Sequence, residues 1–282
     1  MNSAAPRLAR IDLHPIKSLD PVALHESRIG PSGGLEHDRA WSLFSADGRT
    51  MNGKRTAAIH RIRSSFAPDF SSVSLSVPGG RCMISAAIPG AAPSMSVIEI
   101  PPATFAFPRG HDAAAAWFSE YFQQDIVVRY SPDGYPDDTE ANGPTIVSTA
   151  SLEAVSEWFP EIPLAEARRR FRTSLELDGV PAFWEDRLFG ENKGTIVRFR
   201  IGEVEFEGSN PCKRCPVPPR NPVTGEDLIG FQQRFMAQRQ ANLPAWSSAA
   251  RFDHYYRFTT NTRVAVAEAG KTLRVGDALR FL

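Results

Sequence analysis

The sequence predicts a β-rich α+β protein with two domains and only a few helices. Short stretches of alternating apolar and polar residues recur along the chain, and turns rich in glycine and proline separate them. The chain has 282 residues, 42% of them hydrophobic and 23% charged, which is enough for two packed domains with sizeable cores. We place the boundary at residue 110, after a stretch rich in proline and aromatic residues, so that the domains span 1–110 and 111–282.

The first domain is expected to be a small β-barrel or β-sandwich. Apolar residues alternate with polar ones in Ile11–Leu13 and in Val73–Val77, as they do in strands with one buried face. Turns that contain glycine separate such strands at Pro31–Gly34, Asp47–Gly48 and Pro78–Gly80. Beyond the boundary, Asp112 is expected to cap a helix over 113–122.

The second domain is expected to be β-rich with a few helices. Strands are predicted at Ile126–Val128, Ile146–Val147, Val197–Ile201, Val204–Phe206, Val264–Val266, Leu273–Val275 and Leu279–Leu282. Helices are predicted at Ser151–Phe159, Leu164–Arg170 and Phe231–Ala241. Pro160 ends the first of these helices, because proline cannot continue one. The segment Ser131–Pro144, with its prolines, glycines and acidic residues, is expected to be an exposed loop.

The charge balance excludes some classes of partner. The 32 basic and 32 acidic residues cancel, so neither nucleic acid nor an anionic membrane surface is an expected partner. No apolar run approaches the roughly 18 residues that span a bilayer, and no apolar signal core follows Met1–Pro6. We therefore expect a cytoplasmic protein without a membrane span, in which an anionic ligand would meet local basic clusters.

The pattern Cys212-Lys213-Arg214-Cys215 is the most informative local motif. The basic residues between the two cysteines favour thiolates, which bind metals and attack electrophiles. A zinc site would need further ligands, but Cys82 and the scattered histidines form no matching pair. A redox dithiol would normally precede a helix, which the prolines after Cys215 forbid. Two ordinary buried cysteines beside a charged turn remain an alternative.

Several segments, taken in order, resemble the MOSC superfamily, which includes the C-terminal domain of molybdenum cofactor sulfurases and the amidoxime-reducing components. The N-terminal segments resemble the β-barrel domain that precedes MOSC domains, and the later ones resemble the MOSC domain itself. The segments are Leu13–Ser18, Gly34–Trp41, Ile146–Leu152, Phe171–Ser174, Glu185–Asp186, Pro211–Cys215, Asn221–Gly225 and Arg274–Asp277. The resemblance implies a small N-terminal β-barrel domain packed on a MOSC β-barrel domain.

The resemblance also implies a site for the molybdenum cofactor. In the amidoxime-reducing proteins the second cysteine of such a motif binds molybdenum, so Cys215 is the expected metal ligand and catalytic residue. A thiolate suits this metal as a soft donor beside the two dithiolene sulfurs of the cofactor. The expected contacts to the phosphate and pterin are Lys17, Ser18, Arg39, Arg55, Ser148, Thr149, Arg172, Ser174 and Asn210. Ser148 and Thr149 are included because they open a helix, whose N-terminus attracts anions.

Two departures from the family pattern bear on these residues. Many members have Pro-Asn where this chain has Thr173-Ser174, so Ser174 is expected to replace an asparagine contact. Lys54 and Arg55 compete for one basic position, and we prefer Arg55.

The activity implied is a molybdenum-dependent oxidoreductase that reduces N-hydroxylated, N-oxide or S-oxide small molecules. Three cysteines are too few for an internal four-cysteine cluster, so electrons would come from a separate ferredoxin-, flavin- or cytochrome-type reductase. One alternative is a carrier that holds the cofactor or a persulfide sulfur on Cys215. A third possibility is a protein without enzymatic activity that binds another phosphorylated small molecule in a basic pocket.

Overall fold

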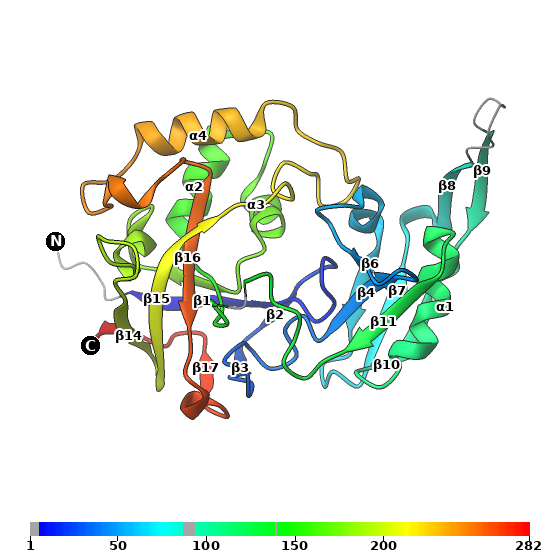
Figure 1. The fold of residues 1–282 in the computed structure, drawn as a ribbon, viewed down its shortest axis with the longest axis horizontal. Helices are drawn as coiled ribbons and strands as arrows, with labels where there is room; N and C mark the ends of the chain where they lie inside the picture. Colours follow the sequence, from blue (N-terminus) through cyan, green and yellow to red (C-terminus); the bar gives the residue numbers. More distant parts are fainter. Residues whose placement is uncertain (1–5, 87–93, 139) are drawn as a thin grey trace.

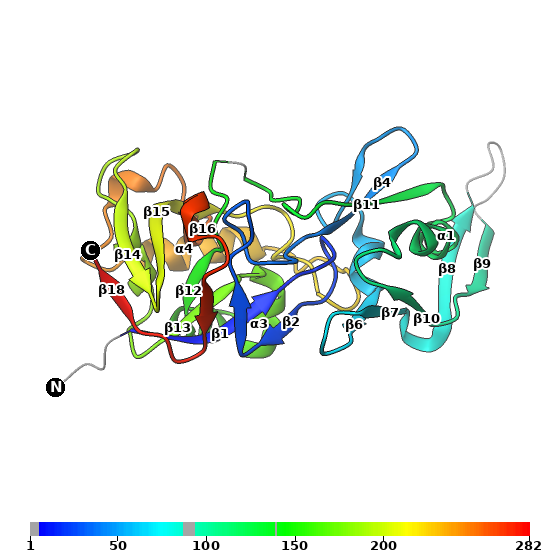
Figure 2. The ribbon, with the colours of Figure 1, turned by 90° about the horizontal axis from the view of Figure 1, so that it is seen from below.

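The structure is a computed structural model that describes residues 6–86, 94–138 and 140–282. Strands dominate these residues, and four α-helices accompany them (Figure 1). The predicted β-rich α+β fold is confirmed. The two halves of the molecule lie side by side along its longest axis, as the view from below also shows (Figure 2).

The larger half is built on an eight-stranded sheet in the order β18-β14-β15-β16-β12-β13-β1-β2. Its strands are β1 (Arg7–Leu13), β2 (Val22–Leu24), β12 (Ile146–Ser148), β13 (Leu175–Asp178), β14 (Val197–Ile201), β15 (Val204–Lys213), β16 (Arg257–Arg263) and β18 (Leu279–Phe281). All neighbours pair antiparallel except β12 and β13. Ile11 of β1 pairs with Leu175 of β13, so the first strand of the chain lies in the sheet of the second half.

Three helices pack beside this sheet: α2 (Thr149–Trp158), α3 (Leu164–Phe171) and α4 (Phe231–Ala241). Their shared core is aromatic, and the rings of Phe171 and Phe258 lie 4.4 Å apart between centroids. All three predicted helices are confirmed. α2 begins two residues earlier than predicted because Ser148 is its N-cap, with its hydroxyl accepting the N–H of Ser151 at 3.1 Å.

The other half holds two three-stranded sheets, β11-β4-β5 and β10-β7-β6, together with α1 (His111–Phe122). Their strands are β4 (Trp41–Ser45), β5 (Thr50–Met51), β6 (Arg63–Phe66), β7 (Ser72–Ser76), β10 (Ala103–Ala106) and β11 (Ile126–Tyr130). Two ribbons pair β3 (Glu26–Arg28) with β17 (Thr272–Arg274) and β8 (Arg81–Ala86) with β9 (Ser94–Glu99). The side chain of Cys82 lies outside the described residues.

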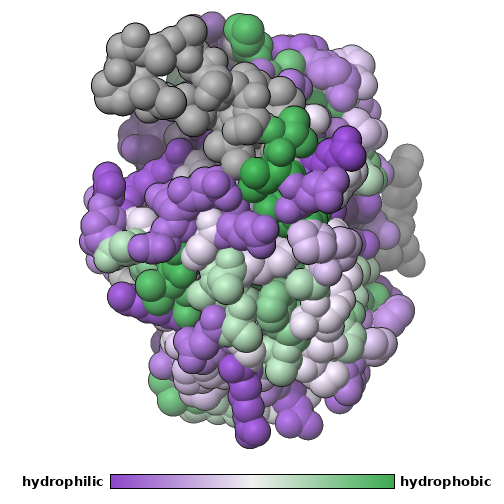
Figure 3. Space-filling view, turned by 90° about the vertical axis from the view of Figure 1, so that its right-hand side faces the viewer, coloured by the Kyte–Doolittle hydropathy of each residue, from purple (hydrophilic) through white to green (hydrophobic). Residues whose placement is uncertain are grey.

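The core of this half combines residues from both sides of position 110. Trp41, Leu43 and Leu75 pack in one cluster with Phe118 of α1 and Val128 of β11. The division at residue 110 therefore stays a prediction, with segments before and after it sharing a core. The end of the molecule that holds α1 shows hydrophilic residues interspersed with weakly and strongly hydrophobic ones (Figure 3).

Two local predictions were wrong. Asp112 does not cap α1, because Gly110 takes the N-cap position and Asp112 lies in the first turn. The predicted strand Val264–Val266 is absent: β16 ends at Arg263 and a short 3-10 turn begins at Val266. The amide of Asn142 contacts both the N–H and the carbonyl of Val264, at 3.3 and 3.2 Å, and so replaces the hydrogen bonds of a strand ladder. Among the described residues no helix has the length and apolar character needed to cross a bilayer.

Candidate functional site

A cavity of about 560 Å³ lies where the two halves meet. Its walls come from the segments that follow β1 and β5, from the connection before β12, from the end of α3 and from β15. This volume is typical of sites that hold a small molecule or cofactor. Six of the predicted site residues line it: Lys17, Ser18, Arg39, Arg172, Asn210 and Cys215.

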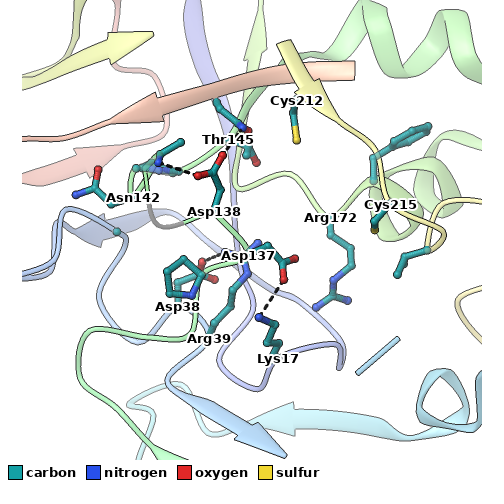
Figure 4. Close-up of a pocket in the computed structure, with 18 of the residues that line it drawn as sticks. Lys17, Asp38, Arg39, Asp137, Asp138, Asn142, Thr145, Arg172, Cys212 and Cys215 are labelled. Atoms are coloured by element: carbon teal, nitrogen blue, oxygen red, sulfur yellow. Dashed lines mark hydrogen bonds and ion pairs between the residues drawn. The ribbon is translucent and has the colours of Figure 1, made fainter. Parts of the chain in front are cut away.

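Backbone hydrogen bonds between two distant segments position the first basic residues. The N–H of Lys17 donates to the carbonyl of Trp41 at 2.8 Å, and the N–H of Arg39 donates to the carbonyl of His14 at 2.7 Å. Asp38 then forms an ion pair with the guanidinium of Arg39. The two cations are thus fixed on one wall of the cavity by the backbone (Figure 4).

Three cavity residues adopt the left-handed backbone conformation, which is uncommon for residues other than glycine. Ser18 has φ 75°, Arg39 has φ 53° and Arg172, the C-cap of α3, has φ 51°. Each such residue costs on the order of 1–2 kcal/mol, and strained residues of this kind cluster at functional sites. All three were predicted as cofactor contacts, so the strain coincides with the proposed site.

Arg172 is a half-buried cation on the cavity wall that a bound anion would stabilise. Burial, and to a lesser degree the charge of Arg39, lowers the pKa of Arg172 to about 10. Its Nη1 donates to the carbonyl of Leu19 at 2.8 Å, but within the described residues it forms no ion pair. The guanidinium points toward the space between Cys215 and Lys17 (Figure 4), where an anionic group would stabilise it.

The two cysteines enter the same cavity from the end of β15. A bulge between Pro211 and Lys213 breaks the register with β16, which suits a strand proline that has no N–H to donate. Both thiols are free and half-buried. Arg214 donates to Sγ of Cys212 at 3.4 Å, whereas Sγ of Cys215 has no hydrogen bond within the described part of the chain. Cys215 therefore presents the less engaged thiol.

Four predicted contacts do not line the cavity: Arg55, Ser148, Thr149 and Ser174. Arg55 is exposed, and its neighbour Lys54 takes the place in the wall. Thr149 donates instead to Glu176 at 2.8 Å. β12 runs away from the cavity after Thr145, so Ser148 lies about 10 Å farther along at the usual rise of a strand.

The N-terminus of α2 holds a carboxyl group of the protein itself. Oε2 of Glu185 accepts the N–H of Ser148 at 3.2 Å and the hydroxyl of Ser151 at 2.9 Å. The predicted anion contact of this helix end is thus made by Glu185, which is fully buried. Burial, and next the charge of Asp186, raises the pKa of Glu185 to about 7.

We expect Glu185→Gln to change how stability depends on pH. Between pH 4.5 and about 7 the folded protein holds a proton on Glu185 that the unfolded chain releases, so stability from this residue falls as pH rises. Glutamine removes this loss, which amounts to about 3 kcal/mol at most. Urea unfolding of both proteins at pH 5 and pH 8 would measure it.

The difference between the pH profiles of stability of Glu185→Gln and wild type isolates the contribution of Glu185. Burial lowers the pKa of His14 and of His60, and these residues change stability in the opposite sense over the same pH range. Glu157→Gln, on the exposed face of α2, is the control and should leave the wild-type profile unchanged. A Glu185→Gln profile parallel to wild type would contradict the assignment.

Sequence reasoning missed part of the cavity wall. Lys54, Asp137, Asp138, Thr145 and Arg214 all line it. Lys54 is the residue that competes with Arg55 for one basic position, and Arg214 lies inside the cysteine motif. The two aspartates belong to the loop Ser131–Pro144, whose acidic composition does not show where the loop folds.

Comparisons with known proteins match the chain to two domain models in succession. A family model for the MOSC N-terminal beta barrel domain matches residues 5–125, and one for the MOSC domain matches residues 144–280. The molybdenum cofactor sulfurases of Drosophila grimshawi and Drosophila mojavensis are each 24% identical to the chain, over 236 and 237 residues. These matches cover 78% of the chain but 29% of each relative, so the chain spans less than a third of their length. The chain belongs to the MOSC family, with a match to the MOSC N-terminal domain followed by a match to the MOSC domain.

Proposed function

We propose that the protein binds the molybdenum cofactor through Cys215 and reduces N-hydroxylated, N-oxide or S-oxide small molecules. The observation that carries the proposal is one cavity that joins a free thiol of one half to the basic side chains Lys17 and Arg39 of the other. Arg172, a half-buried cation that forms no ion pair among the described residues, lies between them (Figure 4).

The donor set fits this cofactor better than a bare metal ion. Within the described ranges no three His, Cys, Asp or Glu side chains are arranged to hold a metal. A metal at Cys215 would therefore bring most of its ligands with it, as molybdenum does with the dithiolene sulfurs of its pterin. Lys17, Arg39 and Arg172 would hold the phosphate, Arg39 and Arg172 with paired N–H donors and Lys17 as a point charge.

The bound cofactor would supply two-electron redox chemistry, in which an N–OH group, two electrons and two protons give an N–H group and water. The chain would bind and orient the cofactor. Asp38 holds Arg39 in place, and the backbone bonds of Lys17 and Arg39 keep both cations on one wall. A separate ferredoxin-, flavin- or cytochrome-type reductase would provide the electrons.

Metal analysis followed by an activity assay tests the proposal. Protein purified from a host that makes the cofactor is expected to contain close to one molybdenum per chain. It should also reduce an amidoxime with an artificial electron donor, measured as the amidine formed. Protein without molybdenum would refute the proposal.

A second candidate function is a carrier that holds the cofactor or a persulfide sulfur on Cys215. The names of the sulfurase relatives favour it, as does the second free thiol, Cys212, in the same cavity. A cofactor carrier would retain molybdenum yet fail to reduce any N-hydroxylated compound, and a persulfide carrier would do neither. The two measurements above therefore separate enzyme from carrier.

A further inference from the structure

The acidic segment 131–138, which we call the strap, crosses the cavity and contacts both of its sides. The carbonyl of Tyr135 accepts a hydrogen bond from Nζ of Lys17 at 2.9 Å, and its N–H donates to the carbonyl of Arg39 at 3.0 Å. Farther along, Asp138 accepts a hydrogen bond from Asn261 at 3.4 Å, on the far wall. The strap is thus anchored by its backbone at Tyr135. Its acidic end is held through the side chains of Asp137 and Asp138 (Figure 4).

Asp137 places a negative charge where the basic wall is densest. Its Oδ1 lies 3.0 Å from Nζ of Lys17 and 3.1 Å from Nζ of Lys54, so one oxygen bridges two ammonium groups. Burial by itself would raise the pKa of Asp137, but the two lysines hold it far below its usual value. A phosphate oxygen would make the same bridge, because it carries comparable charge and accepts the same donors.

The two lysines differ in exposure, and Lys54 keeps 37% of its side chain exposed. Lys17 keeps only 13% of its side chain exposed, and burial lowers its pKa, so it depends on a nearby anion. Asp137 itself is half exposed, which leaves its carboxylate able to exchange with water. Partly exposed ion pairs are weak, so a stronger anion can displace this one.

We propose that Asp137 is a built-in competitor for the anion site of Lys17 and Lys54, displaced when a phosphate-bearing ligand enters. The strap would then set the affinity of the cavity for phosphate and keep the two lysines paired in the empty protein. This inference rests on the proposed function for the identity of the natural ligand, but it can be tested with inorganic phosphate alone.

The test is calorimetric titration of inorganic phosphate into the full chain, produced in cells that cannot make the cofactor. Asp137→Asn removes the competing charge at constant size and is expected to bind phosphate about three- to tenfold more tightly than wild type. Asp133→Asn is the matched control, because Asp133 also belongs to the strap and lines the cavity but forms no ion pair within the described residues. Its affinity should equal that of wild type.

Adding Lys17→Met to Asp137→Asn should abolish the gain in phosphate affinity, which would place the phosphate at Lys17. Equal gains in Asp137→Asn and Asp133→Asn would indicate a general charge effect and overturn the proposal. So would an unchanged or weaker affinity in Asp137→Asn, or no phosphate binding by any of these proteins. Loss of molybdenum binding with the phosphate pattern intact would refute only the proposed function.

Discussion

Molybdenum retained by the purified protein is expected to fall at least tenfold when Cys215 is replaced by serine. A cysteine thiolate is a soft donor that matches a metal already bound by dithiolene sulfurs. A serine hydroxyl is a harder donor and is protonated near neutral pH in the absence of the metal, so it should bind this metal more weakly than a thiolate does. Elemental analysis of wild type and variant, purified side by side from a host that makes the cofactor, measures the change.

Cys212→Ser is the matched control for this experiment. It makes the same chemical change three positions earlier, in the same cavity, on a thiol that Arg214 already engages. This variant should keep wild-type molybdenum content. Retention by both variants, or equal loss in both, would contradict the assignment of Cys215 as the ligand.

Much of the fold could be predicted from local patterns because burial sets the periodicity of the sequence. Val73 and Leu75 alternate with serines and are fully buried in β7, and Val197–Ile201 forms β14 as predicted. The strand expected at Val264–Val266 shows the limit of this reasoning. Its apolar residues suited a strand, but the side chain of Asn142, far away in the sequence, takes its backbone hydrogen bonds.

The candidate site was predictable only in part, since its walls come from segments that meet through tertiary packing. Lys17 donates to the carbonyl of Tyr135, 118 positions away, and no local pattern encodes that pairing. Ser148 was expected to face the cofactor because helix N-termini attract anions. The start of this helix does bind a carboxyl group, but that group is the side chain of Glu185 and not a ligand.

A large loss of stability is expected when Asp186, the neighbour of Glu185, is replaced by asparagine. Asp186 and Arg239 form an ion pair with 3% and 1% of their side chains exposed, and Ser247 also donates to the carboxylate. Arg239 lies over the rings of Phe183 and Phe252, at 4.1 and 5.0 Å, with little access to water. The variant would leave this cation unpaired, which should lower the free energy of unfolding by about 3–5 kcal/mol.

Urea unfolding at pH 7 measures this loss, and Asp253→Asn provides the comparison. Asp253 also pairs with an arginine, Arg257, but its side chain is 65% exposed, so its removal should cost less than about 1 kcal/mol. Similar decreases in the free energy of unfolding of the two variants would show that burial of the ion pair does not determine how much its loss destabilises the protein.

The double variant Asp186→Asn, Arg239→Met separates two contributions to the free energy of unfolding. One is the favourable energy of the ion pair, and the other is the cost of a buried guanidinium without its carboxylate partner. If the loss in Asp186→Asn comes from an unpaired guanidinium, replacing that group with an apolar side chain should recover a substantial part of the stability. In the single variant Asp186→Asn, Arg239 is retained and the negative charge of Asp186 is lost, so the raised pKa of Glu185 should fall. The pH window in which Glu185 weakens the fold would consequently narrow from its upper end, which links this buried pair to the carboxyl group at the start of α2.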